Sequence, residues 1–256
     1  MGVKHHLIDF VDVGTKYSVA DYVRDANAAI DDICGRGKIP FLAGGTGLYI
    51  DSLVNNVRFF DGDTDKNLRQ KLEAETEKLG AVKMLEKLAS VDPEAAAKLH
   101  PNNTKRIIRA LELYELTGKT FSETQKQSLS EPSRFEPVFV GIAFNDRQKL
   151  YERIDLRVDL MIESGLLTEA KQYSEISSKT TSSQAIGYKE LKPYFDGEIT
   201  LEQAVSNLKL ATRHYAKRQM TWFRRNDAIK WFCRDLYGDS RDFTADVINY
   251  LKGVLK

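Results

Sequence analysis

The stretch that decides the fold is Lys38-Ile39-Pro40-Phe41-Leu42-Ala43-Gly44-Gly45-Thr46-Gly47-Leu48-Tyr49. An apolar run over residues 39–43 stops at two glycines, and a helix-like pattern follows. This order predicts a buried parallel strand, a tight turn and a helix N-terminus. The glycines lack a Cβ atom, so a ligand or another backbone can approach the turn closely, and the helix amides favour an anion or polar ligand atom. A plain strand-to-helix turn would carry the same glycines, so the ligand site is a hypothesis.

The elements around this stretch indicate a parallel α/β sheet. Residues 18–36 predict a helix, because Ser18 is a suitable N-cap, an apolar face runs along the segment, and Gly35 and Gly37 close it. Residues 48–54 predict a further short helix. A helix, a strand, a glycine turn and another helix in succession are typical of parallel α/β architecture.

Two later apolar runs also predict strands. Residues 138–143 are expected to form a second buried strand, and residues 229–233 a short late one. Only two strong strands precede residue 200, whereas an α/β sheet usually holds about five. The sheet is therefore either small or completed by residues outside this chain.

The middle of the chain predicts a helical insertion. Residues 66–116 are rich in Lys, Glu, Leu and Ala, Asp92-Pro93-Glu94 is expected to begin one short helix, and Asn103-Thr104 caps another. Residues 122–137 are polar and predict a loop. The expected organisation is a first core segment at 1–57, an all-helical insertion at 58–132, and a second core segment with basic C-terminal helices at 133–256.

Composition excludes several classes of protein. The 256 residues are 42% hydrophobic and 29% charged, as in ordinary soluble proteins, and no run approaches the roughly 18 apolar residues of a membrane helix. Two distant cysteines suit a reducing compartment. We therefore expect a cytoplasmic protein without a membrane partner. The net charge of +1 says nothing about nucleic acid, so any basic surface must be local.

Two predicted helices carry basic residues at helical spacing. Lys105, Arg106 and Arg109 lie on the helix expected over 104–117, where they would either contact phosphate or form a solvated stripe. On the helix expected over 146–164, the aspartates at 155 and 159 interleave with Arg153 and Arg157. That spacing predicts ion pairs within the helix.

The segment from residue 209 to 234 combines cations with aromatic rings. A single acid, Asp227, stands among its basic residues, and aromatic residues are interleaved with them. Such a mixture suits a phosphate backbone with unstacked bases, although core aromatics with solvated cations would produce the same pattern. The excess of positive charge favours nucleic acid. The four histidines form no ligand set, so no transition-metal site is expected.

Ordered motifs occur along the whole chain. They are His5-His6-Leu7-Ile8-Asp9, Ser18-Val19-Ala20-Asp21-Tyr22, Gly37-Lys38-Ile39-Pro40, Gly44-Gly45-Thr46-Gly47-Leu48-Tyr49, His100-Pro101-Asn102-Asn103, Arg109-Ala110-Leu111-Glu112, Thr117-Gly118-Lys119-Thr120, Arg153-Ile154-Asp155-Leu156-Arg157-Val158, Ile186-Gly187-Tyr188-Lys189-Glu190 and Ala216-Lys217-Arg218-Gln219-Met220-Thr221-Trp222-Phe223-Arg224. In this order they resemble the tRNA dimethylallyltransferase family, bacterial type.

The resemblance implies a nucleoside-kinase-like α/β core, N-terminally incomplete, with an all-helical insertion. It implies transfer of a dimethylallyl group from dimethylallyl diphosphate to N6 of adenosine 37 in the tRNA anticodon loop, with Mg²⁺ assisting the diphosphate, and a monomer is expected. Thr46 looks like the catalytic channel threonine near the attacking amine. Arg157 is similar to an arginine that steadies the diphosphate, where it would counter charge growing on the leaving group.

The resemblance also implies a set of tRNA contacts. They are Arg69, Lys105, Arg106, Ile107, Ile108, Arg109, Gln184, Gly187, Tyr188, Lys189, Lys217, Arg218, Gln219, Trp222 and Arg224. Family members usually carry Arg at the position of Lys189. A point charge there replaces a planar fork that could bind bidentately or stack.

One departure bears on activity. Family members begin with a strand, a P-loop of the form GxTxxGK[ST] and an Asp that serves as general base, and nothing in this sequence matches that loop. Met1 would then be an internal methionine or the start of a shortened chain. We therefore expect the 256 residues alone to be inactive. The alternatives are a tRNA-binding remnant without catalysis and an ATP-binding nucleotide-kinase relative, which the same missing loop weakens.

Overall fold

The computed structural model describes residues 2–12, 14–57, 65–129, 132–174 and 185–255. The chain divides into two compact units. Residues 1–50 and 136–256 form the first, called here the α/β unit, and residues 51–135 form the second, called the helical unit.

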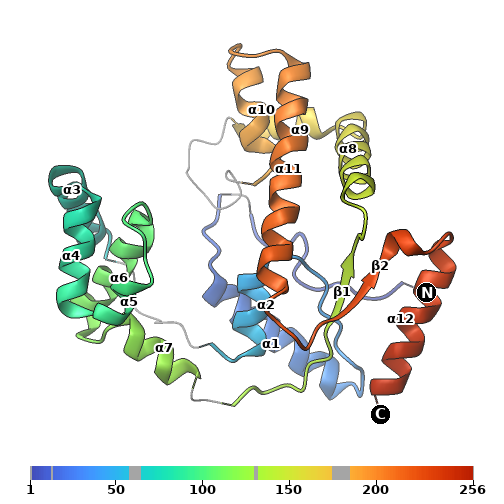
Figure 1. Ribbon diagram of the computed structural model, residues 1–256, viewed down its shortest axis with the longest axis horizontal. Helices are drawn as coiled ribbons and strands as arrows, with labels where there is room; N and C mark the ends of the chain where they lie inside the picture. The colour runs from blue at the N-terminus through green and yellow to red at the C-terminus, as the bar shows by residue number, and fades with distance from the viewer. Residues whose placement is uncertain (1, 13, 58–64, 130–131, 175–184, 256) are drawn as a thin grey trace. The chain divides into compact units, whose positions relative to one another are not determined.

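The α/β unit holds most of the helices and both strands of the described chain (Figure 1). In order, its elements are α1 (Val19–Gly35), the first half of α2 (Gly47–Val54), β1 (Val140–Ala143), α8 (Arg147–Glu163), α9 (Leu166–Ser174), α10 (Tyr188–Phe195), α11 (Leu201–Phe223), β2 (Lys230–Cys233), the 3-10 turn η2 (Arg234–Leu236) and α12 (Ser240–Val254). β1 and β2 pair in parallel, with Val140 opposite Lys230 and Ala143 opposite Cys233. The architecture is α/β with a small parallel sheet, as the sequence predicts.

The core of the α/β unit lies among α8, α9, α10 and α11. It is built from Val158, Leu166, Ala170, Leu191, Ala204 and Leu208, all buried. α11 begins at a capping box in which Thr200 and Gln203 bond each other's backbone amides. On α8 the side chains of Ile154 and Val158 are buried.

The strand expected over residues 39–43 is absent from the described part of the chain. These residues join no sheet, and the side chains of Ile39 and Phe41 are 70% and 80% exposed. An apolar run becomes a strand only when another strand satisfies its backbone groups, and no ladder partner reaches this run. The prediction of a buried strand here is therefore wrong. β1 is likewise less buried than expected, because Ile142 is 61% exposed.

Helix boundaries agree closely with the sequence patterns. α1 begins after Ser18, whose hydroxyl accepts a hydrogen bond from the Asp21 amide in a capping box. The short helix α2 and the late strand β2 are also found where the sequence predicts them.

The helical unit contains α3 (Lys66–Leu79), α4 (Ala81–Val91), α5 (Pro93–Ala97), α6 (Thr104–Thr117) and α7 (Phe121–Leu129). Its core includes Leu72, Met84, Leu88, Ile107 and Leu111, none more than 1% exposed. α5 and α6 begin where the sequence predicts, at Pro93 and Thr104.

α7 corrects the prediction of a loop over residues 122–137. Thr120 and Glu123 bond each other's backbone amides at 3.1 and 2.8 Å, which is a capping box that starts the helix. The Thr-x-x-Glu spacing was therefore the signal, and the polar composition of the segment hid it. No helix among the described residues is both long and apolar enough to cross a membrane.

Candidate active site

The turn over residues 44–47, called here the glycine turn, leads directly into the N-terminus of α2. The Thr46 carbonyl accepts hydrogen bonds from the amides of Tyr49 and Ile50 at 3.0 and 3.2 Å, so Thr46 caps the helix. The residue itself is exposed, whereas Gly47 beside it is buried. The backbone of Thr46 is therefore fixed while its side chain lies at the surface.

Side chains of α11 fill the space that the glycines leave. Gln219 Nε2 donates a hydrogen bond to the Gly45 carbonyl at 2.8 Å, and a Cβ atom on Gly45 would lie 2.0 Å from that nitrogen. A Cβ atom on Gly47 would lie 2.2 Å from Cδ1 of Trp222. Neither glycine has a positive φ, so close approach and not backbone strain requires them. The sequence predicts a close approach, and in this structure the approaching groups are Gln219 and Trp222.

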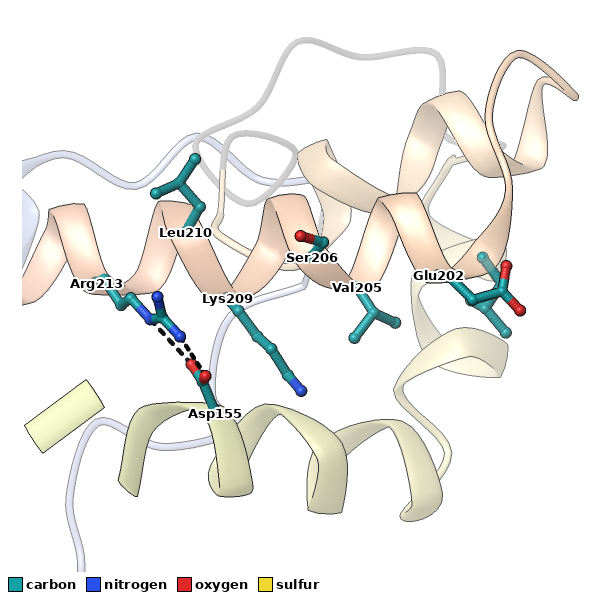
Figure 2. Close-up of a pocket in the computed structure, with 8 residues that line it drawn as sticks. Asp155, Glu202, Val205, Ser206, Lys209, Leu210 and Arg213 are labelled. Atoms are coloured by element: carbon teal, nitrogen blue, oxygen red, sulfur yellow. Dashed lines mark hydrogen bonds and ion pairs between the residues drawn. The ribbon is translucent and has the colours of Figure 1, made fainter. Parts of the chain in front are cut away.

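Ion pairs join α8 to α11 beside a groove of about 650 Å³ (Figure 2). Arg213 donates two hydrogen bonds to Asp155, and its guanidinium lies 4.9 Å from the centre of the Tyr151 ring. Lys209 Nζ lies 2.6 Å from a carboxylate oxygen of Asp159. The predicted pairing within α8 is therefore wrong. Asp155 and Asp159 share the face that packs on α11, which carries the complementary cations.

Arg157 is exposed on α8 and forms no ion pair within the described chain. The helix that carries it is fixed at its start by Asp235, which accepts hydrogen bonds from the amides of Asn145 and Asp146 at 2.8 Å each. These backbone hydrogen bonds hold the pKa of Asp235 below its usual value. The turn η2, which follows β2, thus holds the residues where α8 begins, and the exposed side chain of Arg157 can meet an anion.

The C-terminal part of α11 has two different faces. Lys217, Arg218 and Arg224 are exposed, and the Arg218 guanidinium lies 5.7 Å from the centre of the Tyr215 ring. Gln219 and Trp222 are half-buried on the side of the helix that meets the glycine turn, whereas Arg218, one turn before Trp222, lies at the edge of that side. The expected contacts with tRNA therefore separate into three residues that are open to a partner and two that pack on the glycine turn.

The expected contacts around residue 187 lie at the start of α10. Gly187 is buried with φ 115°, and its amide donates a hydrogen bond to Glu190 at 2.9 Å. The Tyr188 hydroxyl bonds Glu169, and burial together with this hydrogen bond raises the pKa of Tyr188. Lys189 is exposed. Gln184 lies outside the described residues.

The expected contacts in the helical unit lie on α3 and α6. Lys105 and Arg106 are exposed at the start of α6. Ile107 and Ile108 are 0% and 5% exposed, so their side chains cannot touch an RNA; helix periodicity turns them into the core.

A buried acid joins the other two arginines of this set. Arg109 donates a hydrogen bond to Glu112 at 2.9 Å, and Arg69 Nη1 lies 3.9 Å from the same carboxylate oxygen. Sequence reasoning did not assign Glu112 a role. Its signal was a charged residue at the helical spacing of the apolar side chains 107, 108 and 111.

No cluster of three side chains that could ligate a metal occurs in the described ranges. Mg²⁺ usually keeps several waters and binds through one or two carboxylates together with substrate phosphates. The side chains seen here therefore do not form a protein cage for it.

Comparison with known proteins assigns the family. The model of the IPP transferase family matches residues 1–226. The chain belongs to the IPP transferase family. The tRNA dimethylallyltransferase of Caldanaerobacter subterraneus subsp. tengcongensis is 46% identical over 258 residues, covering 100% of this chain and 82% of that protein. The Bacillus subtilis tRNA dimethylallyltransferase is 47% identical over 232 residues, covering 90% of this chain and 73% of that protein.

Solved structures of IPP transferases have the same fold. The full-length tRNA isopentenylpyrophosphate transferase of Bacillus halodurans matches with a TM-score of 0.68 at 41% identity, covering 98% of this chain and 78% of its own. A eukaryotic dimethylallyltransferase, crystallised acting on tRNA, matches with a TM-score of 0.76 at 31% identity, covering 96% and 64%. The resemblance seen in the sequence motifs is thereby confirmed.

Proposed function

We propose that the function of this protein is the transfer of a dimethylallyl group from dimethylallyl diphosphate to N6 of adenosine 37 in tRNA. Relatives named tRNA dimethylallyltransferase match the full length of the chain. The geometric observation that carries the proposal is the double use of α11. One face of this helix holds the turn that contains Thr46, and exposed cations lie at the edge of that face and opposite it.

Two side chains take part in the chemistry in this proposal. The Thr46 hydroxyl orients the adenine amine or the bridging oxygen of the leaving group, and the turn beneath it supplies a fixed backbone. Arg157 has no internal ion-pair partner in the described chain, so its guanidinium can counter negative charge on the departing diphosphate. Mg²⁺ would neutralise diphosphate charge when bound, and no step assigned to these residues depends on it.

The exposed cations bind the RNA backbone in this proposal. Lys217 and Arg218 are exposed on α11, Arg224 is exposed at its C-cap, and Lys189 is exposed near the start of α10. Each phosphate that a cation neutralises releases counterions, so affinity should fall as salt rises.

The experiment measures tRNA binding and transfer with the purified 256-residue protein. We expect salt-dependent binding, and a flatter dependence of log affinity on log salt after Lys217, Arg218 and Arg224 are changed to Ala. An unchanged slope would show that this face does not contact RNA, and no binding at low salt would favour the kinase relative. The transfer itself also needs a loop of the form GxxxxGK[ST] to hold the diphosphate, and these 256 residues contain none, so we expect them alone to bind tRNA without forming prenylated adenosine. Robust turnover would overturn that expectation.

A further inference from the structure

Glu112 is a charged residue in the core of the helical unit. Its side chain is 0% exposed, and the core residues Ile108 and Leu111 precede it on α6. Burying a carboxylate costs several kcal/mol before pairing, and a hydrophobic residue of similar volume often stabilises a fold equally well. Core packing alone therefore does not account for an acid at this position.

The hydrogen bonding of Glu112 is uneven. One oxygen, Oε2, meets Arg109 of α6 at 2.9 Å and Arg69 of α3 at 3.9 Å. The other, Oε1, is buried and has no hydrogen-bond partner in the described structure. The carboxylate thus directs Oε2 toward the two guanidinium groups, while Oε1 is left buried without a hydrogen bond in the described structure.

Arg69 and Arg109 extend from the buried carboxylate of Glu112, called here the buried anchor, to the surface. Their side chains are 41% and 40% exposed, and Lys105, one turn before Arg109 on α6, is exposed as well. A guanidinium has five N–H donors, so each arginine keeps donors that Glu112 does not use. Two guanidinium groups on one carboxylate oxygen are close enough to meet one anion together.

We propose that Glu112 is a positioning residue that holds Arg69 and Arg109 as one two-guanidinium site for a phosphate group of the bound RNA. The inference rests on the proposed function, because it takes RNA as the ligand. Arg suits this role, since its planar fork binds phosphate oxygens in fixed geometry. The buried acid removes the rotational freedom that two surface arginines would otherwise lose on binding.

The test uses the sign of an affinity change. Glu112→Gln removes one negative charge beneath a basic surface, so charge alone would strengthen tRNA binding. If the acid positions the arginines, the same change weakens binding by about tenfold, because it removes the negative charge that holds Arg109 through a hydrogen bond and Arg69 through an ion pair. The slope of log affinity against log salt should also become shallower by roughly 0.7 to 0.9 for each phosphate that the variant no longer neutralises.

Glu73→Gln is the matched control. Glu73 accepts a hydrogen bond from Arg69 Nε at 3.2 Å but is 52% exposed, so the change removes one negative charge beside the same arginine and leaves the buried carboxylate of Glu112 in place. We expect unchanged or tighter tRNA binding for this variant. Equal or tighter binding by Glu112→Gln, at unchanged thermal stability, would overturn the inference. Failure of the unsubstituted protein to bind tRNA at low salt would instead reject the proposed function.

A second set of variants serves if Glu112→Gln does not fold. Arg69→Lys and Arg109→Lys keep the net charge and the partners of Glu112 but lose the fork. If the two residues share one phosphate, both single changes weaken binding, and the double change costs clearly less than the sum of the two in free energy. Strictly additive effects, or no weakening, would contradict a shared site.

Discussion

At Gly47 the space that a side chain would occupy is already filled by the indole of Trp222, and at Gly45 it is filled by the amide of Gln219. The two neighbours differ in how easily they can move. The indole of Trp222 is a rigid ring whose edge lies against Gly47, whereas the amide of Gln219 is the end of a flexible side chain that can rotate away. The same added methyl group should therefore have unequal effects at the two positions.

We expect Gly47→Ala to lower the free energy of unfolding by roughly 1–3 kcal/mol, as overpacking does. Gly45→Ala should cost less, about the 1 kcal/mol of the hydrogen bond from Gln219. Gly44→Ala is the control, because a Cβ atom there meets nothing within 4 Å. Denaturant unfolding of the three variants measures the order. A Gly47→Ala variant as stable as Gly44→Ala would show that Trp222 of α11 does not pack tightly against the glycine turn.

At the scale of elements, Asp92 joins two helices of the helical unit. Its carboxylate caps α5 by accepting from the Ala95 amide at 3.0 Å, and it holds the first turn of α7 through the amide and hydroxyl of Ser122 at 2.9 and 2.7 Å. Burial opposes the charged form, yet these hydrogen bonds outweigh it and keep the pKa of Asp92 below its usual value.

The lowered pKa of Asp92 predicts a loss of stability in acid. A carboxyl group whose pKa falls on folding contributes stability above its unfolded pKa, near 3.9, and that contribution disappears as the pH drops through the folded value. Asp92→Asn replaces one acceptor with a donor that faces Ser122, so it should cost roughly 1–3 kcal/mol at neutral pH. The difference between the two proteins should shrink toward pH 3 in thermal unfolding. A constant difference from pH 7 to pH 3 would contradict the role of the ionised carboxylate.

Elements whose signals are local could be predicted from the sequence. α1, α5 and α8 begin at side-chain caps formed by a few adjacent residues, whereas Asn103 precedes α6 without a side-chain cap bond. The boundaries that the sequence predicts for these helices agree with the structure to within a residue or two. The strand expected at residues 39–43 could not be predicted, because a strand depends on a distant partner and its composition says nothing about that partner. α7 was missed although its Thr120–Glu123 capping box was visible.

In the candidate site too, the features with local signals could be predicted and the contacts between distant segments could not. Motifs located the glycine turn and the basic face of α11, because residue type and spacing specify them. That Gln219 and Trp222 pack inward depends on how α11 meets the glycine turn. That Asp155 and Asp159 pair with another helix depends on how α8 and α11 meet, and no local pattern encodes either contact. Glu112 shows the same limit, since only the fold brings Arg69 to it.

At the scale of the whole molecule, the two units differ in how complete their cores are. Among its described residues, the helical unit has one cluster of nine buried apolar side chains contributed by α3, α4, α5 and α6. The α/β unit leaves Ile39, Phe41 and Ile142 more than half exposed. Apolar surface of this kind weakens the drive to fold and promotes association.

We expect residues 51–135 to fold when produced alone, with a helical circular dichroism spectrum and one cooperative thermal transition worth about 3–5 kcal/mol. The pair Leu72→Ala and Leu79→Ala provides the control, because Leu72 is 0% exposed and Leu79 is 50% exposed. Only Leu72→Ala should strongly lower the midpoint temperature of the transition. Gradual melting without a transition would show that the helical unit depends on the rest of the chain.

α11 is one uninterrupted helix of 23 residues, and its last turns both touch the glycine turn and carry cations at the surface. A continuous helix moves as a stiff rod, so a tilt imposed on its outer face is transmitted to its inner face. Docking of a polyanion on Lys217 and Arg218 would then shift Gln219 and, through it, the carbonyl of Gly45. A substitution selected to alter which RNA is held would also alter how Thr46 is presented, so specificity and reactivity in this protein should evolve together.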